Sequence, residues 1–153
     1  MAIELREVTD EVREELRSVR VGEGQERFVS SVEESLAEAE LYPQAKPWFR
    51  AVYADGVAVG FVMISWDVEP DPPELWGPWF LWKLLIDERY QRRGLGTATL
   101  DLIVERFRSG GAVAMSTSAG QGEGSPIAFY ERYGFERTGE LHGNEVMLRL
   151  EIS

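Results

Sequence analysis

The 153-residue chain contains no cysteine and only one histidine, His142. Without cysteine there is no disulfide, no thiolate metal site and no cysteine nucleophile. His142 lies in a segment with Gly143 and Asn144 that is typical of a turn, and a single histidine cannot build a metal site by itself. No serine lies in a Gly-x-Ser-x-Gly sequence and no serine–histidine pair is evident. We therefore expect neither a bound metal nor a covalent enzyme intermediate.

Positive charge and long apolar runs are also scarce. Lys and Arg number 16 against 27 Asp and Glu, a formal net charge of −11. This balance disfavours nucleic acid as a partner, because phosphates need a basic surface. A negative field attracts small cations, although acidity that serves only solubility explains the charge equally well. No apolar run approaches the roughly 18 residues of a membrane span, and residues 1–7 lack an apolar signal region. We expect a cytoplasmic protein without a membrane partner.

The length fits one domain, residues 1–153, without repeats or linkers. Hydrophobic periodicity and turn residues predict the order β-α-α-β-β-β-α-β-α-β-β. The predicted strands are 3–8, 49–54, 57–66, 79–86, 112–116, 135–138 and 146–152. The predicted helices begin at 10, 25, 95 and 126 and end near 19, 40, 108 and 134. Helices interleaved with apolar strands predict an α/β layered domain with a mixed sheet.

A glycine-rich stretch, Gln-Arg-Arg-Gly-Leu-Gly-Thr-Ala at 91–98, lies between the apolar strand 79–86 and the next helix. Glycine lets the backbone approach a ligand closely and adopts positive φ without strain. A helix N-terminus offers unpaired N–H groups and the positive end of a dipole, which together bind phosphates. The loop is therefore predicted to hold a pyrophosphate. An ordinary strand-to-helix turn with solvated arginines is the alternative.

The loop matches neither common nucleotide motif. The Gly-Lys-Ser/Thr of a Walker A loop is missing, and Thr99 stands where a dinucleotide fingerprint needs its third glycine. It does fit Gln/Arg-x-x-Gly-x-Gly/Ala between a strand and a helix. With the element order and Phe-Tyr-Glu-Arg-Tyr-Gly-Phe at 129–135, the chain resembles the GNAT superfamily of acetyl-CoA-dependent N-acetyltransferases. The resemblance covers nearly the whole chain and implies a twisted, mixed, mostly antiparallel sheet of about six or seven strands flanked by about four helices.

The resemblance assigns the donor site to the loop, the strand before it and the helix at 126–134. Loop amides would wrap the pyrophosphate of CoA, and arginines would add charge-assisted contacts. The strand backbone would bond the pantetheine and polarise the thioester carbonyl. The residues implied are Leu84, Leu85, Ile86, Gln91, Arg92, Arg93, Gly94, Leu95, Gly96, Thr97, Tyr130 and Arg132. Each arginine has a plain alternative as a solvated side chain.

Tyr130 occupies the family position of the general acid. A tyrosine, with a pKa of about 10, can give a proton to a departing thiolate whose thiol has a pKa of about 8.5. The alternative is a buried tyrosine whose hydroxyl bonds the backbone. Many family members carry Asn seven residues earlier, where it contacts CoA, whereas this chain has Glu123. That acid must point away from a polyanionic donor or serve another purpose.

The acceptor site is less specific in sequence. An alkyl amine has a pKa of about 10.4 and must lose a proton, so a carboxylate is needed, acting directly or through water. Candidates for this base are Glu33, Glu34, Asp67 and Glu69, with Glu33 and Glu34 preferred. Cation–π contacts could come from Trp66, Trp76, Trp79 or Trp82. The residues proposed for the acceptor are Gln25, Phe28, Glu33, Asp67 and Trp76, and each has an alternative as a solvated acid or packing residue.

A looser similarity links the chain to the bacterial polyamine (spermidine/spermine) acetyltransferases. It rests on Gly-Gln at 24–25, Phe-Val at 28–29, Ser-Leu-Ala-Glu-Ala at 35–39, Val-Gly-Phe-Val-Met at 59–63 and Trp-Lys-Leu-Leu-Ile-Asp at 82–87. We expect acetyl transfer from acetyl-CoA to a small cationic amine, directly in a ternary complex. Other acceptors (an aminoglycoside, an amino acid or a protein N-terminus) and a catalytically silent CoA-binding module are the alternatives. Members of the family are often homodimers, which extends to this chain as an expectation.

Overall fold

The computed structural model describes residues 2–26, 28–72 and 75–152. Position 27 of a predicted helix, positions 73–74 of a predicted loop and the two chain ends lie outside the described residues. Seven strands form one sheet in the order β1-β2-β3-β4-β5-β7-β6. They are β1 (Ile3–Arg6), β2 (Pro47–Ala54), β3 (Val57–Ser65), β4 (Phe80–Ile86), β5 (Ala114–Gly120), β6 (Glu136–His142) and β7 (Glu145–Glu151). Only β4 and β5 pair in parallel among the described strands, which confirms the mixed, mostly antiparallel sheet.

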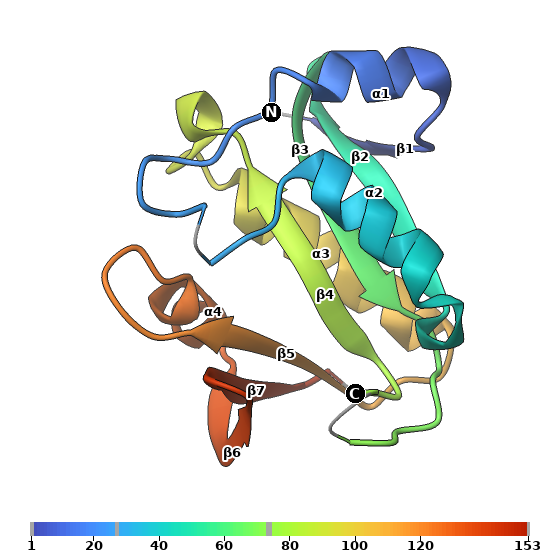
Figure 1. Ribbon diagram of the computed structural model, residues 1–153, viewed down its shortest axis with the longest axis vertical. Helices are drawn as coiled ribbons and strands as arrows, with labels where there is room; N and C mark the ends of the chain where they lie inside the picture. The colour runs from blue at the N-terminus through green and yellow to red at the C-terminus, as the bar shows by residue number, and fades with distance from the viewer. Residues whose placement is uncertain (1, 27, 73–74, 153) are drawn as a thin grey trace.

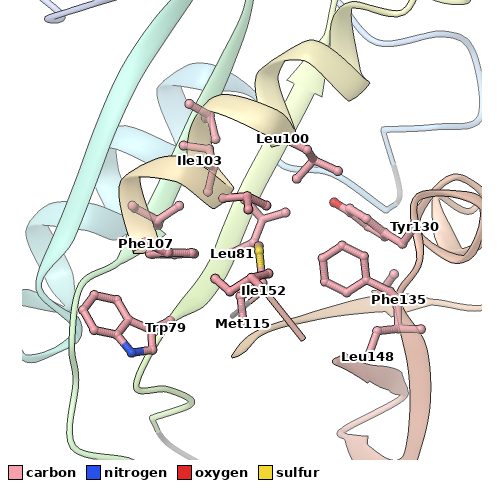
Figure 2. Packing of buried hydrophobic residues seen from close by; sticks show 14 of the residues in the cluster. Trp79, Leu81, Leu100, Ile103, Phe107, Met115, Tyr130, Phe135, Leu148 and Ile152 are labelled. Carbon is pink, nitrogen blue, oxygen red and sulfur yellow. The ribbon is translucent and has the colours of Figure 1, made fainter. Parts of the chain in front are cut away.

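Four helices cover the two faces of this sheet (Figure 1). They are α1 (Asp10–Leu16), α2 (Val32–Leu41), α3 (Leu95–Ser109) and α4 (Ile127–Tyr133), with short 3-10 turns at Pro43–Ala45 and Glu88–Tyr90. One core cluster lies under α1 and α2, and a larger one lies between α3, α4 and the opposite face. In Figure 2, Leu100, Ile103 and Phe107 of α3 pack over the sheet, with Tyr130 and Phe135 beside them. The predicted order of elements is confirmed.

The helix predicted from residue 25 begins later, at Val32. Ser31 accepts the backbone N–H of Glu34, and the Glu34 carboxylate accepts the N–H of Ser31. This capping box satisfies the first free donors of the helix and fixes its start. Gln25 and Phe28 therefore belong to the connection between α1 and α2, so their predicted helical placement was wrong.

The predicted hairpin of β2 and β3 is confirmed. Asp55 and Gly56 have φ values of 50° and 81°, as a two-residue turn of this hand requires. The strand predicted at 112–116 instead runs to Gly120. Its Ser, Thr, Ala and Gly residues give a weak strand signal, and pairing along the whole of β7 decides the outcome.

The parallel strands β4 and β5 separate after a short contact. They pair only at Phe80 with Ser116 and at Leu81 with Thr117. Next to this contact, β4 has a bulge opposite the Met63–Ile64 step of β3. A bulge adds a residue and bends its strand. Leu84 to Ile86 therefore have no partner on β5, and the two strands diverge toward the glycine-rich loop (Figure 1).

Candidate active site

A cleft of about 970 Å³ lies where β4 and β5 diverge, between the start of α3 and α4. Eleven of the twelve predicted donor residues line it: Leu84, Leu85, Ile86, Gln91, Arg92, Gly94, Leu95, Gly96, Thr97, Tyr130 and Arg132. Arg93 does not line the cleft, and its guanidinium lies 5.5 Å from the centre of the Tyr90 ring. The structure thus brings together residues up to 48 positions apart that the sequence motifs had grouped.

The loop presents its backbone to the cleft. Gly94, at φ 78°, caps α3, and apart from its chain neighbours no atom lies within 4 Å of where its Cβ would stand. Within the described part of the chain, the N–H groups of Leu95, Gly96 and Thr97 have no acceptor. These donors, the positive end of the α3 dipole and the side chains of Arg92 and Arg132 suit an anion. The arrangement fits the pyrophosphate of CoA.

Gly96 has a second reason to be glycine. A Cβ at this position would lie 3.1 Å from the ring of Phe129 on α4. The absence of a side chain lets α4 approach the first turn of α3 closely. The glycine motif predicts only the approach of a ligand at Gly96, because the contact with Phe129 joins residues on two different helices.

Tyr130 is 5% exposed and lies on the wall of the cleft, against Phe129 and Phe135. Burial raises the pKa of its hydroxyl to about 12, partly offset by a hydrogen bond with Thr117 of β5. The phenol keeps its proton at neutral pH and can act as a donor.

A second hollow of about 580 Å³ adjoins the first, between α1, α2 and the chain that connects them. Val21, Val29 and Leu85 line both cavities. The walls of the second hollow combine apolar side chains with the carboxylates of Glu26, Glu33 and Glu34. All of its lining residues are Leu16, Arg17, Val19, Arg20, Val21, Glu26, Val29, Ser30, Ser31, Val32, Glu33, Glu34 and Leu85.

Glu33 and Glu34, the preferred base candidates, lie in this second hollow and not in the larger cleft. A hydrogen bond from Arg13, at 2.6 Å, lowers the pKa of Glu33. Backbone and side-chain hydrogen bonds from Ser31 lower the pKa of Glu34. Both carboxylates are therefore ionised at neutral pH, and each already has a partner.

The remaining acceptor candidates on the 67–78 loop lie elsewhere. Ser65, at the end of β3, pairs with Phe80 at the start of β4. Asp67 and Glu69 therefore follow the sheet end opposite the glycine-rich loop, a β4 length of roughly 20 Å away. Neither lines either cavity, and the backbone oxygen of Asp67 accepts a bond from Lys46.

The tryptophans also separate in space. Trp66 and Trp79 meet edge to face at 4.8 Å and enclose Gly110, where a Cβ would lie 2.6 Å from Trp66. Trp82 packs against Tyr42 at the end of α2, and Trp76 contacts His142 at 5.4 Å. None of the four lines either cavity, so the structure does not gather them into an aromatic cage.

The segment between α1 and α2 connects the two sides of the site. The amides of Gln25 and Gln91 pair reciprocally, at 2.9 and 3.4 Å, and Gln91 Nε2 also donates to the carbonyl of Ile86. On the β5 side, the ring of Phe28 lies over Gly120, where a Cβ would stand 3.1 Å from it. Gln25 lines the larger cleft, whereas Phe28 does not.

Sequence reasoning missed Asp87, which anchors the same segment. Its side chain is 1% exposed and accepts hydrogen bonds from the backbone N–H groups of Arg20 and Arg89 and from the Arg89 guanidinium. Burial favours the neutral acid, but these bonds outweigh it and lower the pKa of Asp87. An acid directly after a buried strand was the available signal.

Glu123 is exposed and does not line the larger cleft. This position agrees with the expectation that an acid should point away from a polyanionic donor.

Among the described residues, no group of three or more His, Asp and Glu side chains could hold a metal ion. The described helices are also too short or too polar to cross a bilayer.

Three comparisons connect this geometry to known proteins. Residues 8–135 match the model of the acetyltransferase (GNAT) family. A spermine/spermidine N(1)-acetyltransferase of Bacillus subtilis is 30% identical over 97% of this chain and 99% of its own length. The PaiA N-acetyltransferase of Thermoplasma acidophilum, solved with coenzyme A, superimposes with a TM-score of 0.72 at 16% identity, covering 99% of both chains. An aminoglycoside 6'-N-acetyltransferase complexed with coenzyme A gives a TM-score of 0.71 at 16% identity, covering 100% of this chain and 98% of the other.

Proposed function

The chain belongs to the acetyltransferase (GNAT) family and is an acetyl-CoA-dependent N-acetyltransferase, and on that premise we propose that its acceptor is a primary amine of a polyamine. The observation that carries the proposal is the 30% identity with a spermine/spermidine acetyltransferase along nearly the full length of both proteins. The net charge of −11 agrees with a polycationic substrate.

The donor would lie in the larger cleft. Its pyrophosphate would accept hydrogen bonds from the loop amides at Leu95 to Thr97, beside Arg92. Its pantetheine would run along the part of β4 that has no β5 partner, Leu84 to Ile86. A backbone N–H there can polarise the thioester carbonyl and stabilise negative charge on its oxygen in the transition state.

The acceptor would enter from the second hollow, which meets the cleft at Val21, Val29 and Leu85. Its walls carry aliphatic side chains beside carboxylates. A polyamine alternates methylene segments with ammonium groups, so it matches both kinds of surface. Glu26 is the carboxylate of this hollow without an ion-pair partner among the described residues, because Arg13 occupies Glu33 and the α2 cap occupies Glu34.

Transfer would then be direct. The neutral amine attacks the thioester carbonyl, a C–N bond forms and the C–S bond breaks. The amine proton passes to a carboxylate, for which Glu33 and Glu34 remain our candidates, directly or through water. The Tyr130 phenol donates its proton to the departing thiolate, and its phenolate is reprotonated from solvent. Since the chain has no cysteine, the acetyl group cannot pass through a protein thiol.

Thiol release from acetyl-CoA with a panel of amines tests this proposal. The panel holds spermidine, spermine, an aminoglycoside, free amino acids and a peptide with a free N-terminus. The chain itself gives no background with a thiol-reactive dye because it lacks cysteine. We expect kcat/KM for spermidine or spermine to exceed that of the other amines by at least tenfold. Equal or faster turnover of another class would refute the polyamine assignment.

A further inference from the structure

The segment between α1 and α2 spans the divergence of β4 and β5. At one side, the carbonyl and N–H of Arg20 bond Glu88 and Asp87, and Gln25 pairs with Gln91. At the other side, Phe28 lies over Gly120 on β5. We name the described residues 20–26 and 28–31 the bridge segment (Figure 1). Its residues Val21 and Val29 line both cavities, so it forms the wall between them.

The Gln25–Gln91 pair links this wall to the glycine-rich loop at 91–98. Gln91 Nε2 donates to Gln25 Oε1 at 2.9 Å and to the Ile86 carbonyl at 2.9 Å. Gln25 Oε1 also accepts the Gly22 N–H at 2.7 Å, which closes the turn of the bridge segment. The same Gln25 Oε1 therefore accepts one hydrogen bond from the backbone of the bridge segment and one from Gln91 of the glycine-rich loop. A change at either end alters the hydrogen-bond geometry at the other.

We propose that the Gln25–Gln91 pair couples the two substrate sites, so that donor binding at the 91–97 loop orders the bridge segment and thereby tightens binding of the amine. This inference rests on the proposed function, in that the amine binds against the bridge segment. Gln25 is then a positioning residue, since it acts through Gln91 and Gly22 and contacts neither reacting atom. Linkage requires the reverse effect as well, so the amine must tighten donor binding by the same factor.

The test measures spermidine affinity by calorimetry with and without saturating coenzyme A, which would occupy the donor site but carries no acetyl group to transfer. We expect coenzyme A to tighten spermidine binding about five- to tenfold in the wild-type protein, within the usual range of coupling between sites. In Gln25→Met, which keeps the length of the side chain and removes its amide, the ratio falls to about one. Affinity for coenzyme A alone changes less than about twofold, because Gln91 retains its bond to Ile86.

Kinetics separate this role from a loss of folding. In Gln25→Met the KM for spermidine rises by the lost coupling factor, whereas kcat stays within about twofold. The matched control is Gln44→Met, which changes an exposed glutamine of the 3-10 turn at Pro43–Ala45 and leaves the coupling ratio at its wild-type value. The Gln25→Met/Gln91→Met double variant has no less coupling than Gln91→Met alone. A wild-type ratio near one, or an unchanged ratio in Gln25→Met, overturns the proposal.

Hydrogen exchange of the wild-type protein gives an independent measurement that needs no variant. Coenzyme A alone should slow exchange of the Gly22 amide at least threefold, since this amide bonds Gln25 Oε1. An unaffected Gly22 amide contradicts the coupling. If spermidine neither binds nor reacts while Gly22 is protected, the acceptor assignment fails and the link between loop and bridge segment stands. If spermidine is acetylated while Gly22 is unaffected, the acceptor assignment stands and the link fails.

Discussion

The two cavities share Leu85 in their walls, but they offer a ligand different chemical groups. In the larger cleft, where we place the donor, the groups that would bind it are mainly backbone: free N–H groups at the start of α3 and a stretch of β4 without a partner on β5. In the second hollow, where we place the acceptor, the groups that would bind it are side chains, and two of its carboxylates, Glu33 and Glu34, already have internal partners. Backbone geometry follows from local sequence, whereas the state of a side chain depends on distant neighbours. We therefore expect donor binding to be sensitive to changes in backbone geometry, and acceptor binding to be sensitive to changes in side-chain charge.

The largest effect is expected from Tyr130→Phe, which removes the hydroxyl that we propose as the proton donor and keeps the ring. We expect kcat to fall about 100-fold, the lower part of the range for general acids, while the KM for acetyl-CoA changes less than threefold. The matched control is Tyr53→Phe, because Tyr53 is fully buried in β2 and lines neither cavity. Steady-state rates of both variants decide the matter. Equal losses of kcat in Tyr130→Phe and Tyr53→Phe would show that Tyr130 is not the proton donor.

The same residue predicts an alkaline titration. Burial raises the pKa of Tyr130 to about 12, against an ordinary value of about 10, so its acid constant falls about 100-fold. The folded state holds this proton more tightly than the unfolded state does. The resulting stability is complete below pH 10 and is lost as the pH rises from 10 toward 12. The difference in tyrosinate absorbance between wild type and Tyr130→Phe, recorded immediately after a pH jump, measures this pKa. A step near pH 10 would show that the hydroxyl is solvated.

Gly94→Val tests the dependence of the donor cleft on backbone. Gly94 has φ 78°, and no atom would touch its Cβ, so the cost of valine is backbone strain of about 1–2 kcal/mol. The loop relaxes, the N–H groups of α3 lose their common direction, and the KM for acetyl-CoA rises about 30-fold. Gly139→Val is the control, since Gly139 has φ 90° and equally open space on β6. It should lose similar stability in thermal unfolding and keep its KM. A Gly94→Val enzyme with wild-type KM would mean that the loop does not bind the donor.

The same contrast explains what could be predicted from sequence. Gly94, the Asp55–Gly56 turn and the strand-to-helix context of the loop are local signals, and they predicted the hairpin and most of the glycine-rich loop residues that line the larger cleft. The start of α2 is also signalled locally, by Ser31 and Glu34, although hydrophobic periodicity placed the start of this helix at residue 25. In contrast, the Arg13–Glu33 and Gln25–Gln91 contacts join residues 20 and 66 positions apart. No periodicity or spacing in the sequence encodes such pairs, so these contacts could be found only in the folded structure.

Glu26→Gln tests the acceptor side, where charge rather than backbone should matter. Glu26 lines the second hollow and has no ion-pair partner among the described residues. Loss of one exposed attraction to an ammonium should raise the KM for spermidine about fivefold, with the KM for acetyl-CoA unchanged. Glu23→Gln is the matched control, because Glu23 is an exposed neighbour that lines neither cavity. The effect should shrink at high salt. Identical spermidine KM values for both variants would place the amine outside this hollow.

Arg13→Gln should have the smallest effect, and in the opposite direction. The Arg13 guanidinium holds Glu33 at 2.6 Å. If the amine binds in the second hollow, as we propose, Arg13 would compete with its ammonium for that carboxylate. Both side chains are about half exposed, so the pair is weak and its removal should lower the KM for spermidine only about twofold. The hydrogen bond from Arg13 lowers the pKa of Glu33, and without it that pKa returns toward its ordinary value. In both proteins the carboxylate is ionised at pH 6 and at pH 8, so the twofold change should be the same at both. A higher KM for spermidine in Arg13→Gln would show that Arg13 shapes the hollow and does not compete for Glu33. Acceptor binding would then depend on side-chain packing, whereas we expect donor binding to depend on backbone geometry.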